Sequence, residues 1–346
     1  MRHHDQNSLP VVVVTSQLEP EIRQALESPF TGMAEVVYVD DNNLNVSDLK
    51  NWKERARVLV FGGKSSKDFT YGLIGDLPKL EHIQLQSAGA DYVDFTRIPK
   101  QITICSNVNG FSEPIAEYVL TMICSHYKNV VINHNELKMG IFSHHRESRS
   151  IMRPKVLIVG FGGIGKAVSQ LLKQALNADI VAVNRSGKID PLGVYDSVIS
   201  LNSLAQSIDD VDIVVLSIPL NNQTKGLVDA SLLEAMKKNA LLINVARAGL
   251  INQSALYEHL RMHPSFGAVI DAWWIEPFHH GEFRIDYPFL DLRNVIGSPH
   301  NSFYSKHAFL KSRRMIGENI ARFLSGENVT GRIDRNDYQN MHSDND

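Results

Sequence analysis

The first hundred residues alternate short runs of apolar, mostly β-branched residues with segments of mixed polarity. This alternation is typical of parallel strands that are joined by crossover helices. The pattern predicts a doubly wound parallel sheet in an α/β domain. We expect its five strands at Val11–Thr15, Val36–Val39, Val58–Phe61, Ile83–Gln86 and Ile102–Ile104.

A second alternating block follows a helix that we expect at Pro114–Lys128. The polar, histidine-rich stretch 133–153 is interpreted as a crossing between two domains. The block opens with a buried strand, Lys155–Gly160, and an amphipathic helix, Ile164–Leu176, and so predicts a second, larger parallel α/β sheet. Its further strands are expected at Ile180–Val183, Val211–Ser217, Ala240–Val245, Ala268–Asp271 and Asn294–Ile296.

The domain boundaries follow from these two blocks. We expect a flavodoxin-like substrate domain over residues 8–107, completed by a C-terminal helix within residues 304–326, and a Rossmann domain over residues 108–303. The cleft between the two domains is the expected place of the active site. Residues 327–346 have almost nothing apolar to bury, so they are predicted to form a flexible tail.

Charge and cysteine content narrow the class of protein. Lys and Arg number 35 against 38 Asp and Glu, for a net charge of −3, and no basic run is present. Nucleic acid and membrane surfaces are therefore not expected as partners. The two cysteines, Cys105 and Cys124, form no CxxC pair. No apolar leader is expected, and no run reaches the ~18 apolar residues that a membrane span needs. These features favour a cytoplasmic protein.

A glycine cluster lies between the strand and the helix that open the second block, in the segment KVLIVGFGGIGKAV. In a dinucleotide fingerprint Gly160 would allow the tight turn, Gly162 the approach of the pyrophosphate, and Gly165 close packing of helix on strand. The same letters also resemble a P-loop, but Ala167 stands where a Ser or Thr should hold Mg²⁺. A glycine turn that merely packs is the structural alternative.

The residues after the next strand bear on the cofactor. A site for NAD usually presents Asp or Glu there to bind the ribose 2′-hydroxyl, whereas this chain has Asn184, Arg185 and Ser186. A cation and a hydroxyl can bind a 2′-phosphate through charge-assisted hydrogen bonds. The sequence therefore predicts a preference for NADP(H), with NAD(H) as the alternative because Asn184 can still bind an unphosphorylated ribose.

Ionisable residues also follow three apolar strands of the second block: Arg247, then Asp271 and Glu276, then His300. The carboxyl ends of strands in open α/β sheets are where ligands bind. A fixed cation, a carboxylate and a proton donor at one edge suit a carbonyl substrate that carries a carboxylate. Each residue also has a structural explanation: a surface ion pair for Arg247, a helix N-terminal charge for Glu276 and a loop histidine for His300.

These motifs together resemble the D-isomer-specific 2-hydroxyacid dehydrogenases, a family that includes glyoxylate/hydroxypyruvate reductases, formate dehydrogenase and phosphite dehydrogenase. The likeness spans roughly residues 55–325. It is carried by QSAGAD (86–91), PIAEYVL (114–120), VGFGGIG (159–165), DIVVLSIPLNNQTKGLVD (212–229), INVARAGLI (243–251), DAWWIEP (271–277) and SPHNS (298–302).

The resemblance implies roles for individual residues. Arg247 would bind the substrate carbonyl and carboxylate, His300 would be the acid/base, and Glu276 would orient it and favour its protonated form. Ser87 and the backbone amides of Ala88 and Gly89 would receive the substrate carboxylate. The residues expected to bind the cofactor are Gly160, Gly162, Gly163, Ile164, Gly165, Asn184, Arg185, Ser186, Ile218, Pro219, Thr224, Val245, Ala246, Arg247, Asp271 and His300.

Three departures from the family pattern concern the substrate. Ala248 replaces a glycine, Trp273 and Trp274 replace smaller apolar residues, and 24 residues separate Glu276 from His300, which is longer than in many relatives. They leave the chemistry intact and put the size of the substrate in doubt.

The predicted function is NAD(P)-dependent hydride transfer to C2 of a small 2-oxo acid, of the glyoxylate/hydroxypyruvate type, by a homodimer that forms through the Rossmann domain. A formate- or phosphite-type dehydrogenase and a dinucleotide-sensing scaffold of the co-repressor kind remain alternatives. The histidines that occur as neighbours have no HExxH motif or acidic loop beside them, so no metal site is predicted. They are His3, His4, His144, His145, His279 and His280.

Overall fold

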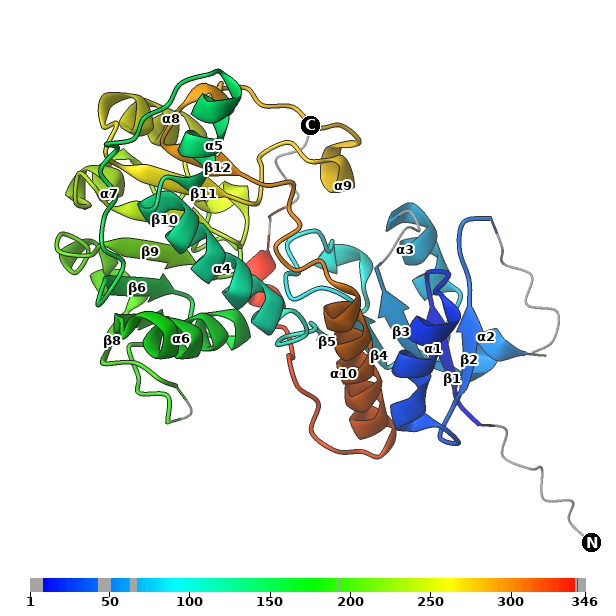
Figure 1. The fold of residues 1–346 in the computed structure, drawn as a ribbon. Helices are drawn as coiled ribbons and strands as arrows, with labels where there is room; N and C mark the ends of the chain where they lie inside the picture. Colours follow the sequence, from blue (N-terminus) through cyan, green and yellow to red (C-terminus); the bar gives the residue numbers. More distant parts are fainter. Residues whose placement is uncertain (1–8, 43–50, 63–66, 192, 340, 342–346) are drawn as a thin grey trace, which may run out of the picture. The chain divides into compact units, whose positions relative to one another are not determined.

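The computed structural model describes residues 9–42, 51–62, 67–191, 193–339 and 341. Contacts divide the chain into two compact units, Met1–Phe111 with Ser305–Asp346, and Ser112–Tyr304. Both have a parallel sheet with helices around it (Figure 1). The predicted class, two doubly wound parallel α/β domains, is confirmed.

The first unit has a five-stranded sheet in the order β2-β1-β3-β4-β5. This is the flavodoxin-like strand order. Every neighbouring pair is parallel. The strands are β1 (Val11–Val14), β2 (Glu35–Tyr38), β3 (Ala56–Phe61), β4 (His82–Leu85) and β5 (Thr103–Cys105).

The four valines of β1 show why this sheet needs helices on both faces. All four are buried, and successive side chains along a strand point to opposite faces. Val12 and Val14 belong to a cluster with residues of α1 (Pro20–Glu27) and α10 (Lys306–Leu324). Val11 and Val13 belong to the cluster on the other face, which includes residues of α3 (Lys67–Gly75). A short helix, α2 (Trp52–Arg55), precedes β3.

The second unit has a seven-stranded sheet in the order β12-β11-β10-β9-β6-β7-β8, again with parallel pairs throughout. The strand order reverses between β6 and β9, which is the switch point of a Rossmann sheet. The strands are β6 (Lys155–Val159), β7 (Asp179–Asn184), β8 (Ser197–Ser200), β9 (Ile213–Leu216), β10 (Leu241–Asn244), β11 (Gly267–Ile270) and β12 (Val295–Gly297).

Helices cover this sheet as well. On one face α4 (Ser112–Tyr127) packs beside α6 (Gly163–Leu176). Leu232 and Leu233 of α7 (Ala230–Ala235) and Leu256 of α8 (Gln253–Met262) join strand residues in one large core cluster. The shorter α9 (Pro277–His280) follows β11.

Two elements differ from the expectations. The stretch interpreted as a crossing contains a helix, α5 (Val130–Lys138), which directly follows α4. The edge strand β8 was not expected, because its sequence Ser-Val-Ile-Ser has no apolar run and none of its residues is fully buried.

The predicted flexible tail is wrong for residues 327–339. Ile333 and Tyr338 pack against the core of the first unit, and Ile333 N donates to Ile104 O at 2.9 Å. Arg335 donates to the carbonyls of Ile98, Pro99 and Ile102 at 2.7–2.9 Å. Few apolar residues are needed to hold this segment in place, because the side chain of one arginine donates to three backbone carbonyl groups. Residues 340 and 342–346 lie outside the described part of the chain.

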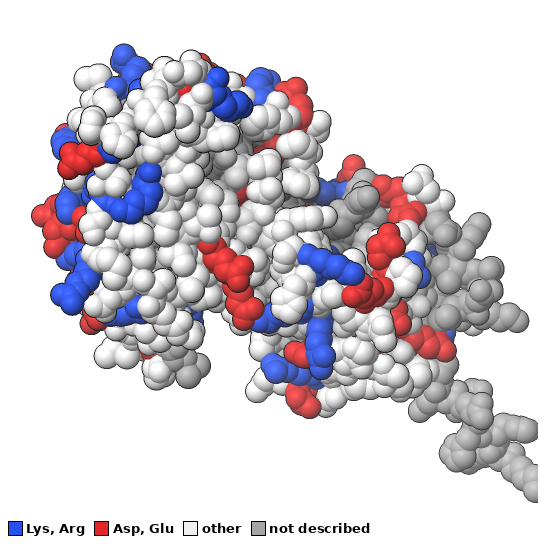
Figure 2. All heavy atoms as spheres, viewed as in Figure 1, with Lys and Arg blue, Asp and Glu red and all other residues white. Residues whose placement is uncertain are grey.

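The surface agrees with the modest net charge. On the face that Figure 2 shows, blue and red side chains are interspersed, and that face has no continuous basic patch. No described helix is long and apolar enough to cross a membrane.

Candidate active site

The glycine turn lies where β6 meets α6. Gly160 has a φ of +96°, and a Cβ there would lie 2.5 Å from the backbone nitrogen of Ile218. A Cβ on Gly165 would lie 2.2 Å from the carbonyl oxygen of Gly160. Gly160 is required by its positive φ and by close packing, and Gly165 is required by close packing. The turn itself therefore accounts for both of them without a ligand.

Gly162 is different, because nothing lies within 4 Å of the position that its Cβ would take. It is exposed and caps the N-terminus of α6, ahead of Gly163 and Ile164 in the first turn. An open approach to the free amides of a helix N-terminus is what a pyrophosphate needs. The residues present therefore fit a dinucleotide.

The strand-end loop after β7 is organised by Asn184. Its Oδ1 accepts from the backbone nitrogens of Ser186 and Gly187 at 3.1 and 2.6 Å, and its Nδ2 donates to Lys188 O at 2.8 Å. Arg185, Ser186 and Lys188 are exposed on this loop. Asn184 thus holds the turn together, and Lys188 is a second cation that the sequence analysis did not single out.

The segment after β9 holds three more of the predicted cofactor residues. Ile218 and Pro219 are partly or fully exposed, whereas Thr224 is buried. The Thr224 hydroxyl donates to Pro219 O at 2.7 Å and accepts from Asn221 N at 2.9 Å. Thr224 therefore fixes the shape of this segment, leaving Ile218 and Pro219 at its surface.

Arg247 follows β10 and is partly buried. Its Nη1 donates to Ala246 O at 2.9 Å. Asn244, the last residue of β10, holds this turn, since its Oδ1 accepts from Ala246 N and its Nδ2 donates to Arg247 O. The sequence analysis missed Asn244, although a polar residue at the end of an apolar strand is a signal that could have found it. Val245 and Ala246 are buried beside it.

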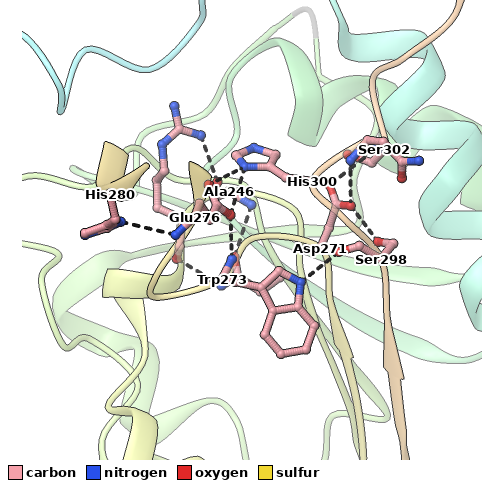
Figure 3. Close-up of polar contacts among 11 residues, drawn as sticks. Ala246, Asp271, Trp273, Glu276, His280, Ser298, His300 and Ser302 are labelled. Carbon is pink, nitrogen blue, oxygen red and sulfur yellow. Dashed lines mark hydrogen bonds and ion pairs between the residues drawn. The ribbon is translucent and has the colours of Figure 1, made fainter. Parts of the chain in front are cut away.

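His300 and Glu276 form a pair within hydrogen-bond distance (Figure 3). Nδ1 of His300 lies 3.0 and 2.9 Å from the two carboxylate oxygens of Glu276. Glu276 also accepts from the backbone nitrogen of Trp273 at 2.6 Å. The carboxylate fixes the proton on Nδ1, so Nε2 is the nitrogen left to exchange a proton with a ligand.

The charge state of Glu276 follows from its surroundings. Burial opposes ionisation of this carboxyl, which is 5% exposed. The hydrogen bonds from His300 and Trp273 and the charges of His300 and Arg247 outweigh burial, so the pKa of Glu276 lies below its ordinary value. Glu276 is therefore a carboxylate at neutral pH, as the support of a protonated histidine requires.

Asp271 holds the loop that carries His300. It is fully buried, its Oδ1 accepts from the Ser298 hydroxyl at 2.5 Å and from Asn301 N at 3.1 Å, and its Oδ2 accepts from Ser302 N at 3.3 Å. Its carbonyl accepts from His300 N at 2.9 Å. These bonds hold His300 at a φ of +50°, which is rare for a residue with a side chain (Figure 3).

The network extends to α4. The Tyr118 hydroxyl lies 2.5 Å from the Ser298 hydroxyl, and burial raises the pKa of Tyr118 to about 12. The contact between these two residues was not predicted from the sequence, because 180 residues separate them.

Both tryptophans in the DAWWIEP segment serve the core. Trp273 is 7% exposed and donates to Ser298 O at 2.8 Å, while Trp274 donates to Ile251 O and stacks on Phe289. The aromatic rings near His300 are instead Phe278 and Phe303, edge-on at 6.3 and 6.2 Å between ring centres. Phe278 is exposed.

The predicted carboxylate-binding residues lie in the first unit, in the bend after β4. Ser87 Oγ lies 2.7 Å from Gly89 O and 3.0 Å from the Tyr92 hydroxyl, while Ala88 is partly exposed. The bend is anchored from α10, where Arg313 donates to Gln86 Oε1 at 2.7 Å. Arg313 was not predicted.

The second unit therefore brings together most of the predicted residues. The glycine turn, the Asn184 loop, Arg247, Glu276 and His300 all follow the carboxyl ends of its parallel strands. A Rossmann sheet with a glycine turn and a histidine–carboxylate pair at that edge is the arrangement of nicotinamide-dependent oxidoreductases.

Comparison with known proteins gives the family. Residues 120–302 match the model of the D-isomer specific 2-hydroxyacid dehydrogenase, NAD binding domain. This match covers more than half of the chain, and the chain belongs to that family.

Individual relatives are distant. A D-3-phosphoglycerate dehydrogenase of Methanocaldococcus jannaschii is 28% identical over 91% of this chain, and a glycerate dehydrogenase of Methylorubrum extorquens is 28% identical over 72%. The aligned regions span 58% and 78% of the lengths of these two relatives. The crystal structure of a family member from Xanthobacter autotrophicus Py2, in complex with NADPH and MES, superposes with a TM-score of 0.79 at 23% identity, covering 96% of this chain and all of that one.

Proposed function

We propose that this protein is an NAD(P)-dependent reductase of a small 2-oxo acid. The observation that carries the proposal is the His300–Glu276 pair, which lies with Arg247 at the edge of the sheet that also holds the glycine turn. When bound, the nicotinamide would supply the hydride.

The proposed roles follow from charge and geometry. Arg247 has a planar fork that can hold a carboxylate and a carbonyl oxygen together. His300 delivers a proton from Nε2 to the oxygen that becomes the hydroxyl, while Glu276 holds Nδ1–H and stabilises the charged imidazole before transfer. Ser87 and the amides of Ala88 and Gly89 are the proposed receptors of the substrate carboxylate.

The test is an absorbance assay of nicotinamide oxidation with glyoxylate, hydroxypyruvate, pyruvate, phenylpyruvate and branched 2-oxo acids. Glyoxylate and hydroxypyruvate are the expected substrates. Because Phe278 and Phe303 lie beside His300, a higher kcat/KM with phenylpyruvate would shift the assignment to apolar 2-oxo acids. Reduction of NAD(P)⁺ by formate or phosphite, with no turnover of 2-oxo acids, would contradict the proposal.

His300→Ala should lower turnover by ~10²–10⁴-fold, the usual contribution of general acid catalysis. Cofactor affinity, measured by fluorescence titration, should stay close to the wild-type value. A matched control is His307→Ala, since His307 is an exposed residue of α10. Near wild-type turnover of His300→Ala would remove His300 from the mechanism.

We further propose that NADP(H) is the preferred cofactor. The loop after β7 carries no carboxylate at the strand end, while Arg185, Ser186 and Lys188 are exposed on it. A double variant, Asn184→Asp with Arg185→Ala, restores a carboxylate and removes a cation. Aspartate oxygens can still accept the two backbone bonds that Asn184 accepts, and the variant loses only the bond from Nδ2 to Lys188 O, so the turn should persist. The ratio of kcat/KM values should shift from NADPH towards NADH, and a wild-type enzyme that prefers NADH would contradict the assignment.

The proposed assembly is a homodimer through the second unit. The helix α5 and the segment that follows it expose several apolar side chains, and Phe142 is 78% exposed. Exposed apolar surface of this extent is typical of an interaction site. The exposed set is Val130, Val131, Leu137, Met139, Ile141 and Phe142. Light scattering should give the dimer mass for the wild type and the monomer mass for Phe142→Asp with Leu137→Asp, and a monomeric wild type across a dilution series would overturn the proposal.

A further inference from the structure

Three residues with metal-binding side chains meet where α7 packs against α8. Glu234 comes from α7, and His259 and His263 come from the last turn and the C-cap of α8. Residues four apart lie on the same side of a helix, so both imidazoles face the neighbouring carboxylate. The sequence analysis did not single out these residues, because Glu234 lies on a different helix from the two histidines and meets them only in the folded structure.

The distances suit chelation. Oε2 of Glu234 lies 3.7 Å from Nε2 of His263 and 4.0 Å from Nδ1 of His259, and the candidate ligand atoms all lie within 4.8 Å of one another. In a tetrahedral zinc site with bonds of about 2.0–2.1 Å, neighbouring ligand atoms are about 3.3 Å apart. The Glu234 side chain is exposed, so it can move closer to both rings.

The placement of the ligands also suits a metal. His259 is 8% exposed, and its Nδ1 is the ring nitrogen that lies near Glu234. Lys238 binds the other carboxylate oxygen, Oε1, which leaves Oε2 directed at the two rings.

We propose that Glu234, His259 and His263 form a binding site for a divalent transition-metal ion of the zinc class. Two imidazoles and one carboxylate are borderline ligands that suit Zn²⁺, with water at the fourth position. The partial negative charge at the C-terminus of α8 also favours a cation there.

The topology defines what this metal would do. The helices α7 and α8 precede β10 and β11, so their C-terminal ends lie at the amino edge of the parallel sheet. Glu276 and His300 follow the carboxyl ends of the strands, at the opposite edge. The site is therefore a structural clamp between two helices, separate from the catalytic residues.

The test is titration of the full-length, chelator-treated protein with Zn²⁺ by calorimetry, and with Co²⁺ by visible absorption. We expect one high-affinity ion per chain, a tetrahedral Co²⁺ spectrum and a higher Tm with Zn²⁺. His263→Gln and Glu234→Gln should each weaken Zn²⁺ binding by more than about tenfold, because loss of a group that only orients a metal ligand already has an effect of that size. Both residues are at least partly exposed, so these variants should fold, whereas the buried His259 is left unchanged.

Other neighbouring histidines provide the matched controls. His144→Gln with His145→Gln, and separately His3→Gln with His4→Gln, should retain the high-affinity ion and the rise in Tm. Loss of binding in either control pair, with binding intact in His263→Gln and Glu234→Gln, would overturn the proposal. Failure of the wild type to bind Zn²⁺ or Co²⁺ would overturn it as well.

Discussion

At the scale of single residues, the candidate active site depends on side chains whose partners fix both their charge and their direction. Glu276 is ionised despite its burial because His300, Trp273 and Arg247 stabilise its negative charge. His300 is held in an uncommon backbone conformation by Asp271. Asn184 and Asn244 hold the two strand-end loops that carry Arg185 and Arg247.

The first prediction concerns Arg247. Arg247→Lys keeps the charge but loses the planar fork that can hold two oxygens of the substrate. We expect kcat/KM to fall by roughly 10²-fold, comparable to the loss of a transition-state hydrogen-bond donor. Steady-state kinetics with the best 2-oxo acid checks it. Arg261→Lys, an exposed arginine paired with Glu258, is the control that should leave kinetics unchanged. Equal kinetics for both variants would indicate that Arg247 is only an ion-pair partner.

At the scale of elements, α4 helps to position the loop of His300. The Tyr118 hydroxyl contacts the Ser298 hydroxyl, which in turn donates to Asp271. Tyr118 is partly buried, whereas a second tyrosine on the same helix, Tyr127, is buried and its hydroxyl makes no hydrogen bond within the described structure. The same helix thus carries one tyrosine whose hydroxyl is hydrogen-bonded and one whose hydroxyl is not.

The second prediction compares these two tyrosines. Tyr118→Phe should lower the free energy of unfolding by about 1 kcal/mol, the net contribution of a hydrogen bond, and should lower kcat by loosening the His300 loop. Tyr127→Phe should be neutral or stabilising, because it removes a buried hydroxyl without a partner, and the ring still packs under Arg149. Denaturant unfolding and kinetics of both variants measure the difference. Equal destabilisation would contradict the assigned network.

At the scale of the whole molecule, the stability of the fold is expected to fall in acid, because buried histidines are uncharged in the folded state. His82 in β4 is fully buried and stacks on Phe323, and burial lowers its pKa to about 4. In the second unit, burial and the charge of Arg149 lower the pKa of His126 to about 4 as well. Both units therefore contain a histidine that takes up a proton more readily when unfolded.

The third prediction is the resulting pH dependence. Between pH values of about 6.5 and 4 the unfolded chain binds the proton at His82 and the folded chain does not. Stability is therefore retained above about pH 6.5 and is lost as the pH falls towards 4, by up to about 3 kcal/mol for His82. His82→Phe, which keeps a stacked ring, should flatten the curve of unfolding free energy against pH, whereas His134→Gln at an exposed position should not. An unaltered curve for His82→Phe would rule out this source of acid sensitivity.

The sequence by itself determined the parallel sheets and the edge at which the predicted ligand residues gather. Buried parallel strands read as continuous apolar runs, so local composition was enough to find β1, β6 and β10. The glycine turn could also be predicted, because Gly160 and Gly165 meet requirements set by their immediate neighbours. The edge strand β8 and the ordered residues 327–339 gave no such local signal, since their stability comes from partners elsewhere in the chain.

Only the tertiary structure decided which side chains form pairs. The family resemblance implied that Glu276 pairs with His300, but the bond from Ser302 to Asp271, across 31 residues, had no signal in the sequence. The approach of Glu234 to His259 and His263 likewise depends on how α7 packs against α8. Periodicity assigns a residue to a strand end or a helix face, but hydrogen-bond distances depend on how neighbouring strands and helices pack. Residues distant in the chain meet only when the core has formed, and for that reason these pairs are a property of the fold.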